Sequence, residues 1–263
     1  MLNDIELIVV DNHPQGACSE PLKQSDKNIR NYRYVPRSER TGTCAKEYVF
    51  EAAIGKFVLC IDSHALIAPG GVKRLLDYID AHPFSDDLLQ GPLLFDDLKK
   101  LATHLNPEWR GGFFGRWALD ERGIDIDAPP FEIPMQGTGL LACRKETWPG
   151  LNPAFRGFGG EGWYLNEKFR QRGGRTLCLP FLRWLHRFNR PLGVPYHNSW
   201  SDRVRNYLIG FEELGLPTDT LKAHFMEFLG PAAATAMFQA IERERSQVAS
   251  STAPSLESIS TAC

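Results

Sequence analysis

The sequence contains no apolar run that approaches the roughly 18 to 20 residues needed to cross a bilayer. The first residues, Met1 to Glu6, hold no basic region of the kind that opens a secretory signal peptide. An excess of one charge is also missing, because 30 basic against 32 acidic residues give a formal net charge of -2. Secretion, membrane anchoring and a global attraction to nucleic acid are therefore disfavoured, and any polyanion must meet a local basic patch.

The sequence also has no Cys-x-x-Cys pair and no visible internal repeat. The six cysteines are irregularly spaced, at positions 18, 44, 60, 143, 178 and 263. This spacing predicts reduced thiols in a cytoplasm. The remaining composition, 43% hydrophobic and 24% charged over 263 residues, is enough for one large globular domain or two small ones.

Short apolar runs alternate with helical patterns in the first hundred residues. The runs Ile5 to Val10 and Phe57 to Ile61 are typical of buried strands, and helical spacing covers Cys44 to Ile54 and Val72 to Ile79. This alternation predicts an α/β fold whose ligands bind at the carboxyl ends of the strands. Polar residues just past a strand end are therefore the first candidates for a site.

Other stretches depart from this alternation. The stretch Pro107 to Pro134 is rich in Trp, Phe, Gly and Asp without a sustained period, which predicts a long surface loop or lid. Amphipathic helices are expected from Ser201, and the Ser, Thr and Ala-rich end is expected to be disordered. We therefore expect a main domain at 1–200, a helical extension at 201–245 and a disordered tail at 246–263.

A candidate metal site follows the second buried strand. Asp62 and His64 stand two residues apart at its carboxyl end, a pattern that suits a divalent ion, although such a pair is common by chance and a solvated loop is its alternative explanation. His186 follows a later strand and would supply a third ligand from across the sheet.

These features, in this order, resemble the family 2 glycosyltransferases of GT-A fold. The shared features are a strand ending in Val10-Asp11, a strand ending in Asp62-Ser63-His64, the glycine loop Gly157 to Glu161 and the late His186. The sequence also resembles the polypeptide N-acetylgalactosaminyltransferases, whose metal motif is likewise Asp-x-His with a distant His. The resemblance covers about residues 5 to 190. It implies a mixed α/β sheet flanked by helices, a UDP-sugar donor, and Mn²⁺ held by Asp62, His64 and His186.

The resemblance also implies a set of donor-binding residues. Asp11 matches the acid that meets the uracil or ribose, and capping of the loop before Pro14 is its alternative role. Arg40 and Gly42 match the turn that closes over the nucleotide, although Arg40 is equally explained as a surface arginine. The full expected donor set is Asp11, Arg40, Gly42, Asp62, Gly137 and Gly160.

Glu161, at the end of the glycine loop, matches the acid that deprotonates the acceptor hydroxyl in inverting members of the family. Helix capping is the alternative role. The sequence departs from the family at Gly162, where an acid is usual, and the N-acetylgalactosaminyltransferases are retaining enzymes in which this Glu would bind rather than deprotonate. A second departure is the strand and helix of roughly 30 residues that normally precede the Val-Asp strand. They are absent here, which predicts an incomplete donor site.

The acceptor side is expected to combine aromatic and basic residues. Trp109, Trp117 and Trp163 are candidates for stacking on an acceptor, with hydrophobic anchoring as their alternative role. A basic cluster for phosphates is formed in the sequence by Arg183, Arg187, Arg190, Arg203 and Arg205.

Two strings, Ile133 to Gly137 and Phe181 to Phe188, look like phage-encoded glycosyltransferases found beside TET-type oxygenases. That resemblance implies 5-hydroxymethylcytosine in DNA as the favoured acceptor and the host cytoplasm as the location. The alternatives are a glycan, lipid or protein acceptor, or a non-catalytic module that binds a sugar nucleotide.

Overall fold

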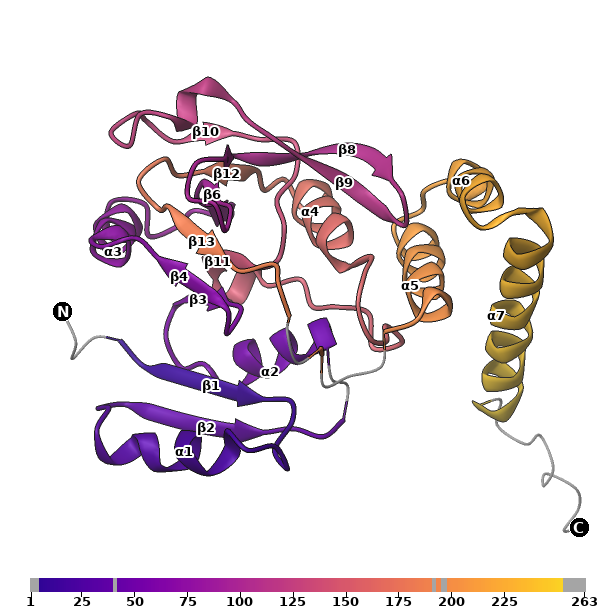
Figure 1. Ribbon diagram of the computed structural model, residues 1–263, viewed down its shortest axis with the longest axis horizontal. Coiled ribbons are helices and arrows are strands. Elements are labelled where there is room, and N and C mark those ends of the chain that lie inside the picture. Colours follow the sequence, from indigo (N-terminus) through magenta and orange to yellow (C-terminus); the bar gives the residue numbers. More distant parts are fainter. Residues whose placement is uncertain (1–4, 40–41, 191–192, 195–197, 253–263) are drawn as a thin grey trace, which may run out of the picture. The chain divides into compact units, whose positions relative to one another are not determined.

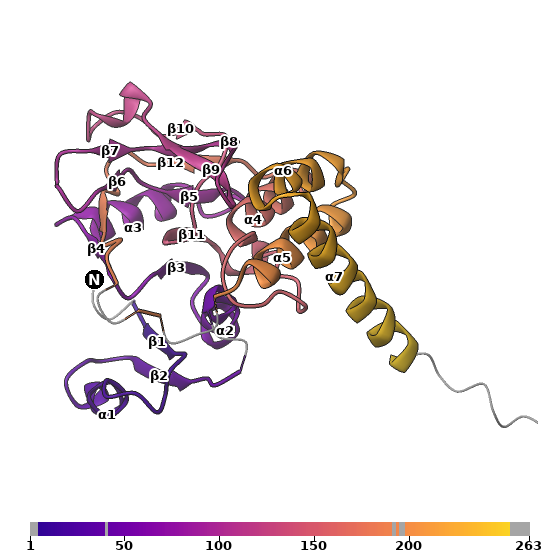
Figure 2. The same ribbon diagram turned by 45° about the vertical axis from the view of Figure 1, so that its right-hand side comes forward.

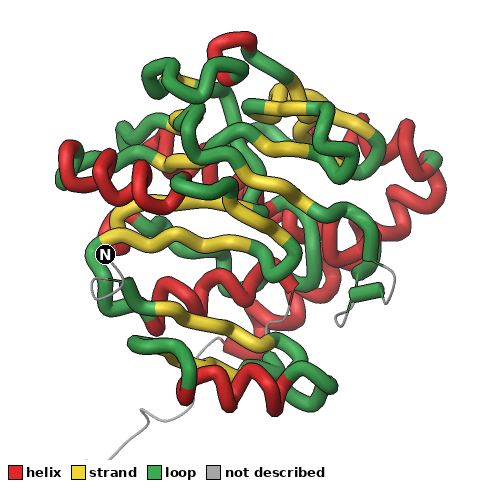
Figure 3. The backbone as a smooth tube through the Cα atoms, turned by 60° about the vertical axis from the view of Figure 1, so that its left-hand side comes forward, coloured by secondary structure: helices red, strands yellow, loops and turns green. Residues whose placement is uncertain are grey.

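The computed structural model describes residues 5–39, 42–190, 193–194 and 198–252, and describes only the backbone of 248–252. The chain forms two compact units, Met1–Pro217 and Thr218–Cys263. All described strands belong to the first unit. In that unit much of the chain around the strands is loop, drawn green in Figure 3.

The first unit is built around a five-stranded sheet in the order β10-β12-β5-β11-β3. Its strands are β3 (Phe57–Ile61), β5 (Leu88–Gln90), β10 (Phe131–Glu132), β11 (Leu140–Arg144) and β12 (Thr176–Cys178). β12 runs parallel to β5, whereas β11 runs antiparallel to both β3 and β5. The mixed α/β architecture expected from the sequence is therefore confirmed.

A second sheet, in the order β4-β13-β6-β7, places the late histidine. Its strands are β4 (Ala65–Ile67), β6 (Leu93–Leu94), β7 (Leu101–Ala102) and β13 (Trp184–His186). β13 pairs antiparallel with β4, so that His186 lies opposite Ala65. Because β4 begins just after Asp62 to His64, this pairing brings residues more than 120 positions apart to one place.

The core beside these sheets is apolar and fully buried. Leu93, Leu140, Leu179 and Leu182 are all 0% exposed, and they belong to one cluster that also contains Trp184. The indole of Trp184 donates a hydrogen bond to the Gly91 carbonyl oxygen at 2.8 Å. Burying a leucine side chain contributes roughly 1.5 to 3 kcal/mol, so this cluster holds β13 firmly in place.

The N-terminal strands form a separate pair. β1 (Leu7–Asp11) and β2 (Tyr32–Pro36) run parallel, and the short helix α1 (Ser19–Lys23) connects them. Figure 1 shows this pair apart from β3. Within the described ranges β1 pairs only with β2, and β3 pairs only with β11. Each of these two apolar strands therefore has one edge without a ladder partner.

The region expected to be a long loop contains a hairpin, so that expectation is wrong for its first part. β8 (His104–Arg110) and β9 (Phe113–Ala118) pair antiparallel, with a turn at Gly111 and Gly112. Gly-Gly is a common two-residue hairpin turn. The pairing is irregular at Pro107, whose nitrogen has no hydrogen to donate to the ladder. Figures 1 and 2 both show this hairpin beside α4.

Helices complete the first unit. The longer ones are α2 (Ala45–Ala52), α3 (Gly71–Ala81), α4 (Glu161–Gln171) and α5 (Trp200–Glu213). Short 3-10 helices lie at Gln24–Lys27, Gly42–Cys44, Glu121–Gly123 and Lys145–Thr147.

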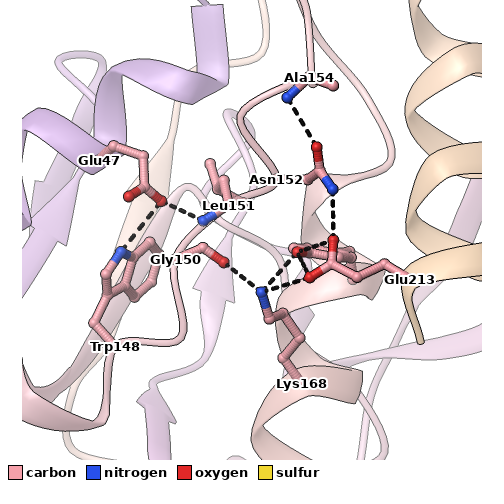
Figure 4. A network of polar contacts seen from close by, with 9 residues as sticks. Glu47, Trp148, Gly150, Leu151, Asn152, Ala154, Lys168 and Glu213 are labelled. Atoms are coloured by element: carbon pink, nitrogen blue, oxygen red, sulfur yellow. Dashed lines mark hydrogen bonds and ion pairs between the residues drawn. The ribbon is translucent and has the colours of Figure 1, made fainter. Parts of the chain in front are cut away.

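A polar network, drawn in Figure 4, ties α2, α4 and α5 to the segment before the glycine loop. Glu47 of α2 accepts hydrogen bonds from the Trp148 indole at 3.2 Å and from the Leu151 amide. Lys168 of α4 lies 3.0 Å from the Glu213 carboxylate of α5 and donates to the Gly150 carbonyl oxygen. These contacts fix the position of α2 relative to the segment that leads into the glycine loop.

The second unit contains α6 (Asp219–Leu229) and α7 (Pro231–Thr252), joined at Gly230. α7 continues to residue 252, into the stretch expected to be a disordered tail from residue 246, and residues 253–263 lie outside the described part. α5 belongs to the first unit, although the sequence analysis placed it in the helical extension. Among the described residues, no helix has both the length and the apolar character that crossing a membrane requires.

Candidate functional site

Three potential metal ligands converge where β3 and β13 end. The Nε2 atoms of His64 and His186 lie 3.0 Å apart, and Asp62 Oδ2 lies 3.5 Å and 3.9 Å from them. All three side chains are partly buried. With metal–ligand bonds of about 2.1 Å, two ligands of one ion stand at most about 4.2 Å apart, so these three atoms fit a single ion. We call Asp62, His64 and His186 the metal triad.

The environment of the metal triad favours neutral imidazoles. Burial first, and then the neighbouring His64, lower the pKa of His186 to about 4. Burial also lowers the pKa of His64, against the opposing effect of Asp62. A neutral imidazole is the form that binds a metal ion. The Nδ1 atom of His186 is buried without a hydrogen-bond partner in the described structure, so the ring is oriented by packing.

Lys46 is a member of the site that the sequence analysis missed. It lies on α2 with 8% of its surface exposed, and its Nζ donates to Asp62 Oδ1 at 2.7 Å. Burial alone would lower the pKa of Lys46, but the neighbouring Asp62, Cys60 and Glu161 together outweigh burial and raise it, so the amine stays charged. A signal existed in the sequence, because Lys46 precedes the buried Phe50 by four positions and so shares its helix face.

Glu161 lies at the start of α4, behind two glycines in the left-handed region. Gly159 has φ +110° and Gly160 has φ +94°, conformations that side chains rarely adopt. They fold the loop back so that the Gly159 amide donates to Glu161 Oε2 at 2.8 Å. Burial raises the pKa of Glu161, and the Lys46 charge and the Gly159 amide offset part of that rise. Gly160 itself packs against Asn206 of α5.

Gly42 packs directly on the glycine loop. It has φ +76°, and a Cβ there would overlap with the Gly157 carbonyl oxygen, which also accepts a hydrogen bond from the Thr43 amide at 3.2 Å. The turn that contains Gly42 therefore touches the loop that holds Glu161. Arg40 lies outside the described residues.

Replacing Gly42 with alanine should therefore lower the free energy of unfolding by about 2 to 4 kcal/mol, because backbone strain and overlap act together. Gly173→Ala is the matched control, since Gly173 has φ +84° with no atom within 4 Å of a built Cβ. That variant should lose only about 1 kcal/mol. Urea denaturation measures both losses, and equal losses would show that the contact with Gly157 is not tight.

Two other predicted donor residues have local roles in the structure. Asp11 accepts hydrogen bonds from the His13 amide at 2.9 Å and from the Tyr34 hydroxyl at 2.6 Å, as expected for its loop-capping alternative. Gly137 lies under Trp117, whose ring would be 3.1 Å from a Cβ at that position. Trp117 also packs against the apolar cluster.

The predicted acceptor aromatics separate into two groups. Trp109 is partly exposed on the hairpin and makes edge contacts with Phe114 and Tyr207. Trp163 is only 9% exposed and stacks on Phe211, with ring centroids 4.2 Å apart. Because its faces are used in packing, the prediction that Trp163 contacts an acceptor is not supported.

The predicted arginine cluster is not one surface patch, which corrects the sequence analysis. Arg203 and Arg205 are each 6% exposed, and Arg203 packs against the rings of Phe113 and Trp200. Both arginines lie in the stretch of α5 from Arg203 to Phe211 that is buried on every side, which charge alone does not indicate. The remaining arginines lie near β13: Arg183 donates to the Ile124 carbonyl oxygen, Arg187 is exposed, and Arg190 lowers the pKa of His64 and His186.

Comparisons with known proteins identify the family and the fold of this chain. The chain is 29% identical over 180 residues to "Probable N-acetylgalactosaminyltransferase 8" from Caenorhabditis elegans, a match that spans 63% of this chain and 42% of that protein. The chain therefore spans less than half the length of this curated relative.

Two solved structures share the fold. GalNAc-T7, in a crystal structure with UDP, GalNAc and Mn²⁺, superposes with a TM-score of 0.59 at 15% identity over 85% of this chain and 48% of that one. S. aureus TarS 1-349 in complex with UDP-GlcNAc gives a TM-score of 0.52 at 14% identity over 87% and 64%. The family described as Glycosyl transferase family 2 matches residues 1–145, more than half of the 263 residues. The chain therefore belongs to glycosyl transferase family 2.

Proposed function

We propose that this protein transfers a sugar from a UDP-sugar to an acceptor hydroxyl with the help of a divalent metal ion. The observation that carries this proposal is the metal triad, whose three ligand atoms lie within 4.8 Å of one another at the ends of two strands. The solved relatives with UDP, one of them also with Mn²⁺, support the same donor and metal class. Two imidazoles favour Mn²⁺ or another transition metal over Mg²⁺.

The groups of the site would have two separate roles, which are neutralising the charge of the diphosphate and accepting the proton of the acceptor. When bound, the metal ion would neutralise charge on the diphosphate of the leaving UDP. Arg190, whose positive charge lowers the pKa of both histidines, would add a second positive charge for the diphosphate. The carboxylate of Glu161 would accept the proton of the acceptor hydroxyl while its oxygen bonds to the anomeric carbon and the bond to UDP breaks. Burial of Glu161 suits this role, because a raised pKa makes a carboxylate a stronger base.

The direct experiment is to incubate the purified protein with UDP-sugars and to measure released UDP with Mn²⁺, with Mg²⁺ and with a chelator. Mn²⁺-dependent release supports the proposal. Binding of UDP-sugar without release, across a broad set of donors and acceptors, would favour a non-catalytic binding module instead.

For the acceptor we propose 5-hydroxymethylcytosine in DNA. The support is the resemblance of two sequence strings together with the exposed Arg187 and the half-buried Arg190 beside the metal triad. Phosphate contacts there would orient the nucleic acid, and the target base would have to be turned out of the stack. Glycan, lipid and protein acceptors are the competing outcomes of an acceptor screen.

Replacing Arg187 with alanine should reduce the slope of log affinity for DNA against log salt concentration by about one unit. The reason is that binding then neutralises one phosphate fewer and so releases fewer counterions from the DNA. Arg172→Ala, an exposed arginine at the opposite end of α4 from Glu161, is the control and should leave the slope unchanged. Fluorescence anisotropy with labelled DNA at several salt concentrations measures both. An unchanged slope in Arg187→Ala, or transfer to peptides or sugars but never to modified DNA, would reject this acceptor.

A further inference from the structure

Lys46 stands in a position that the proposed function does not explain. Its amine donates to Asp62 Oδ1 at 2.7 Å, while Asp62 Oδ2 faces the two imidazoles of the metal triad. The side chain is 9% exposed and the carboxylate 26% exposed, so solvent screens the pair only in part. The one anionic ligand of the triad is therefore bound to a buried cation.

The charges of the site follow from this contact. Asp62 contributes one negative charge, Lys46 cancels it, and neutral imidazoles contribute none. Arg190 acts on both histidines with a positive charge, while Asp96 acts on His186 and Glu161 acts on Lys46 with negative charges. Of these charged groups, the described contacts join only Lys46 directly to a ligand of the triad. Repulsion between a divalent cation and the largely buried Lys46 is stronger than it would be in water, because the effective dielectric constant there is below that of water. The ligand set of a free triad thus carries almost no net negative charge once Lys46 is counted, which weakens it as a cation site even though its ligand atoms are correctly spaced.

We propose that Lys46 suppresses metal binding by the free protein, so that the ion binds together with the diphosphate of the nucleotide. The inference rests on the proposed function and deepens it, because the donor's phosphates supply the negative charge that Lys46 removes from the triad. Lys46 of α2 then determines that the metal ion does not bind before the nucleotide. By thermodynamic linkage, the nucleotide must strengthen the affinity for the metal by the same factor as the metal strengthens the affinity for the nucleotide.

The alternative role for Lys46 is purely geometric, in which it holds the Asp62 carboxylate in the orientation that the metal needs. The two roles predict opposite signs. Removing a charge that repels the ion raises metal affinity, whereas removing a contact that orients a ligand lowers it. Damage to the fold would also lower it.

The test measures Mn²⁺ affinity of the nucleotide-free protein by electron paramagnetic resonance or calorimetry. Lys46→Met should bind Mn²⁺ at least about tenfold more tightly than the wild type, because the repulsion is gone. Lys46→Gln, which keeps a donor for Asp62 without the charge, should also bind more tightly, and Lys46→Arg should match the wild type. The matched control is Lys168→Met, which removes another largely buried lysine, one that is paired with Glu213. It should leave Mn²⁺ affinity unchanged.

A second measurement compares UDP affinity with and without Mn²⁺. In the wild type Mn²⁺ should strengthen UDP binding by at least about tenfold, and in Lys46→Met this coupling should shrink as the free-metal affinity grows. Weaker or unchanged Mn²⁺ binding by folded Lys46→Met or Lys46→Gln would overturn the inference, as would tight Mn²⁺ binding by the wild type alone. Failure of every protein to bind UDP, with Mn²⁺ present, would overturn the proposed function itself, and the free-metal comparison would still decide the role of Lys46.

Discussion

Replacing His186 with alanine is expected to weaken Mn²⁺ binding by more than about tenfold, since even residues that only support a metal ligand typically cost 10 to 100-fold when removed. The Nε2 atom of His186 is one of three ligand atoms, and the described residues offer no other group to take its place within the metal triad. Calorimetry in the presence of UDP measures the loss.

The control for this variant is His82→Ala. His82 is an exposed histidine that stacks on Tyr78 at the end of α3, so its loss should not change Mn²⁺ affinity. Thermal unfolding of both variants shows whether the fold is intact. Unchanged Mn²⁺ binding in folded His186→Ala would remove His186 from the metal site.

The pH dependence of Mn²⁺ binding follows from the same residue. The pKa of His186 is lowered to about 4, so a proton competes with the metal for its Nε2 only when the pH falls toward that value. Affinity should therefore hold through neutral and mildly acidic pH and fall below about pH 5, rather than near the ordinary histidine pKa of about 6.5. Titrating Mn²⁺ at several pH values tests this, and a midpoint near 6.5 would contradict the burial of the ring.

The positions of Asp62 and His64 were predictable because they depend on a strand end. An apolar strand that stops just before Asp62 must place the next polar side chains at the edge of the sheet. His186 was predicted to follow an earlier strand, whereas it is the last residue of β13, a short strand that the sequence did not indicate. What the sequence could not provide was the pairing of β4 with β13, because pairing partners are set by packing of the whole core.

The errors of the sequence analysis share a physical cause, which is that burial cannot be read from charge or aromatic content alone. Arg203 looked like a surface cation, but its guanidinium packs between aromatic rings from β9 and α5. Trp163 looked like a stacking platform and is part of the core. The hairpin of β8 and β9 was missed because Pro107 and the glycines suggest a loop, although a Gly-Gly pair between two aromatic-rich runs is itself a hairpin signal.

Glu161→Gln is expected to lower turnover by about 10² to 10⁴-fold while leaving UDP affinity nearly unchanged, if the carboxylate is the general base. The substitution is informative because glutamine keeps an oxygen that can accept the hydrogen bond of the Gly159 amide, so the loop and the start of α4 keep their main contact. What it removes is the group that takes the proton. Steady-state kinetics and UDP calorimetry on the same preparation separate the two effects.

The pH profile of the wild type gives an independent check on the same role. Burial raises the pKa of Glu161 above its ordinary value of 4.5, so the active, deprotonated form is lost at a higher pH than for an exposed carboxylate, and activity should rise with pH through that raised pKa. Glu167→Gln, six residues further along α4, is the control and should keep both the turnover and the profile. If Glu161→Gln loses UDP affinity in proportion to turnover, Glu161 positions the donor. Unchanged turnover would instead assign it to the cap of α4.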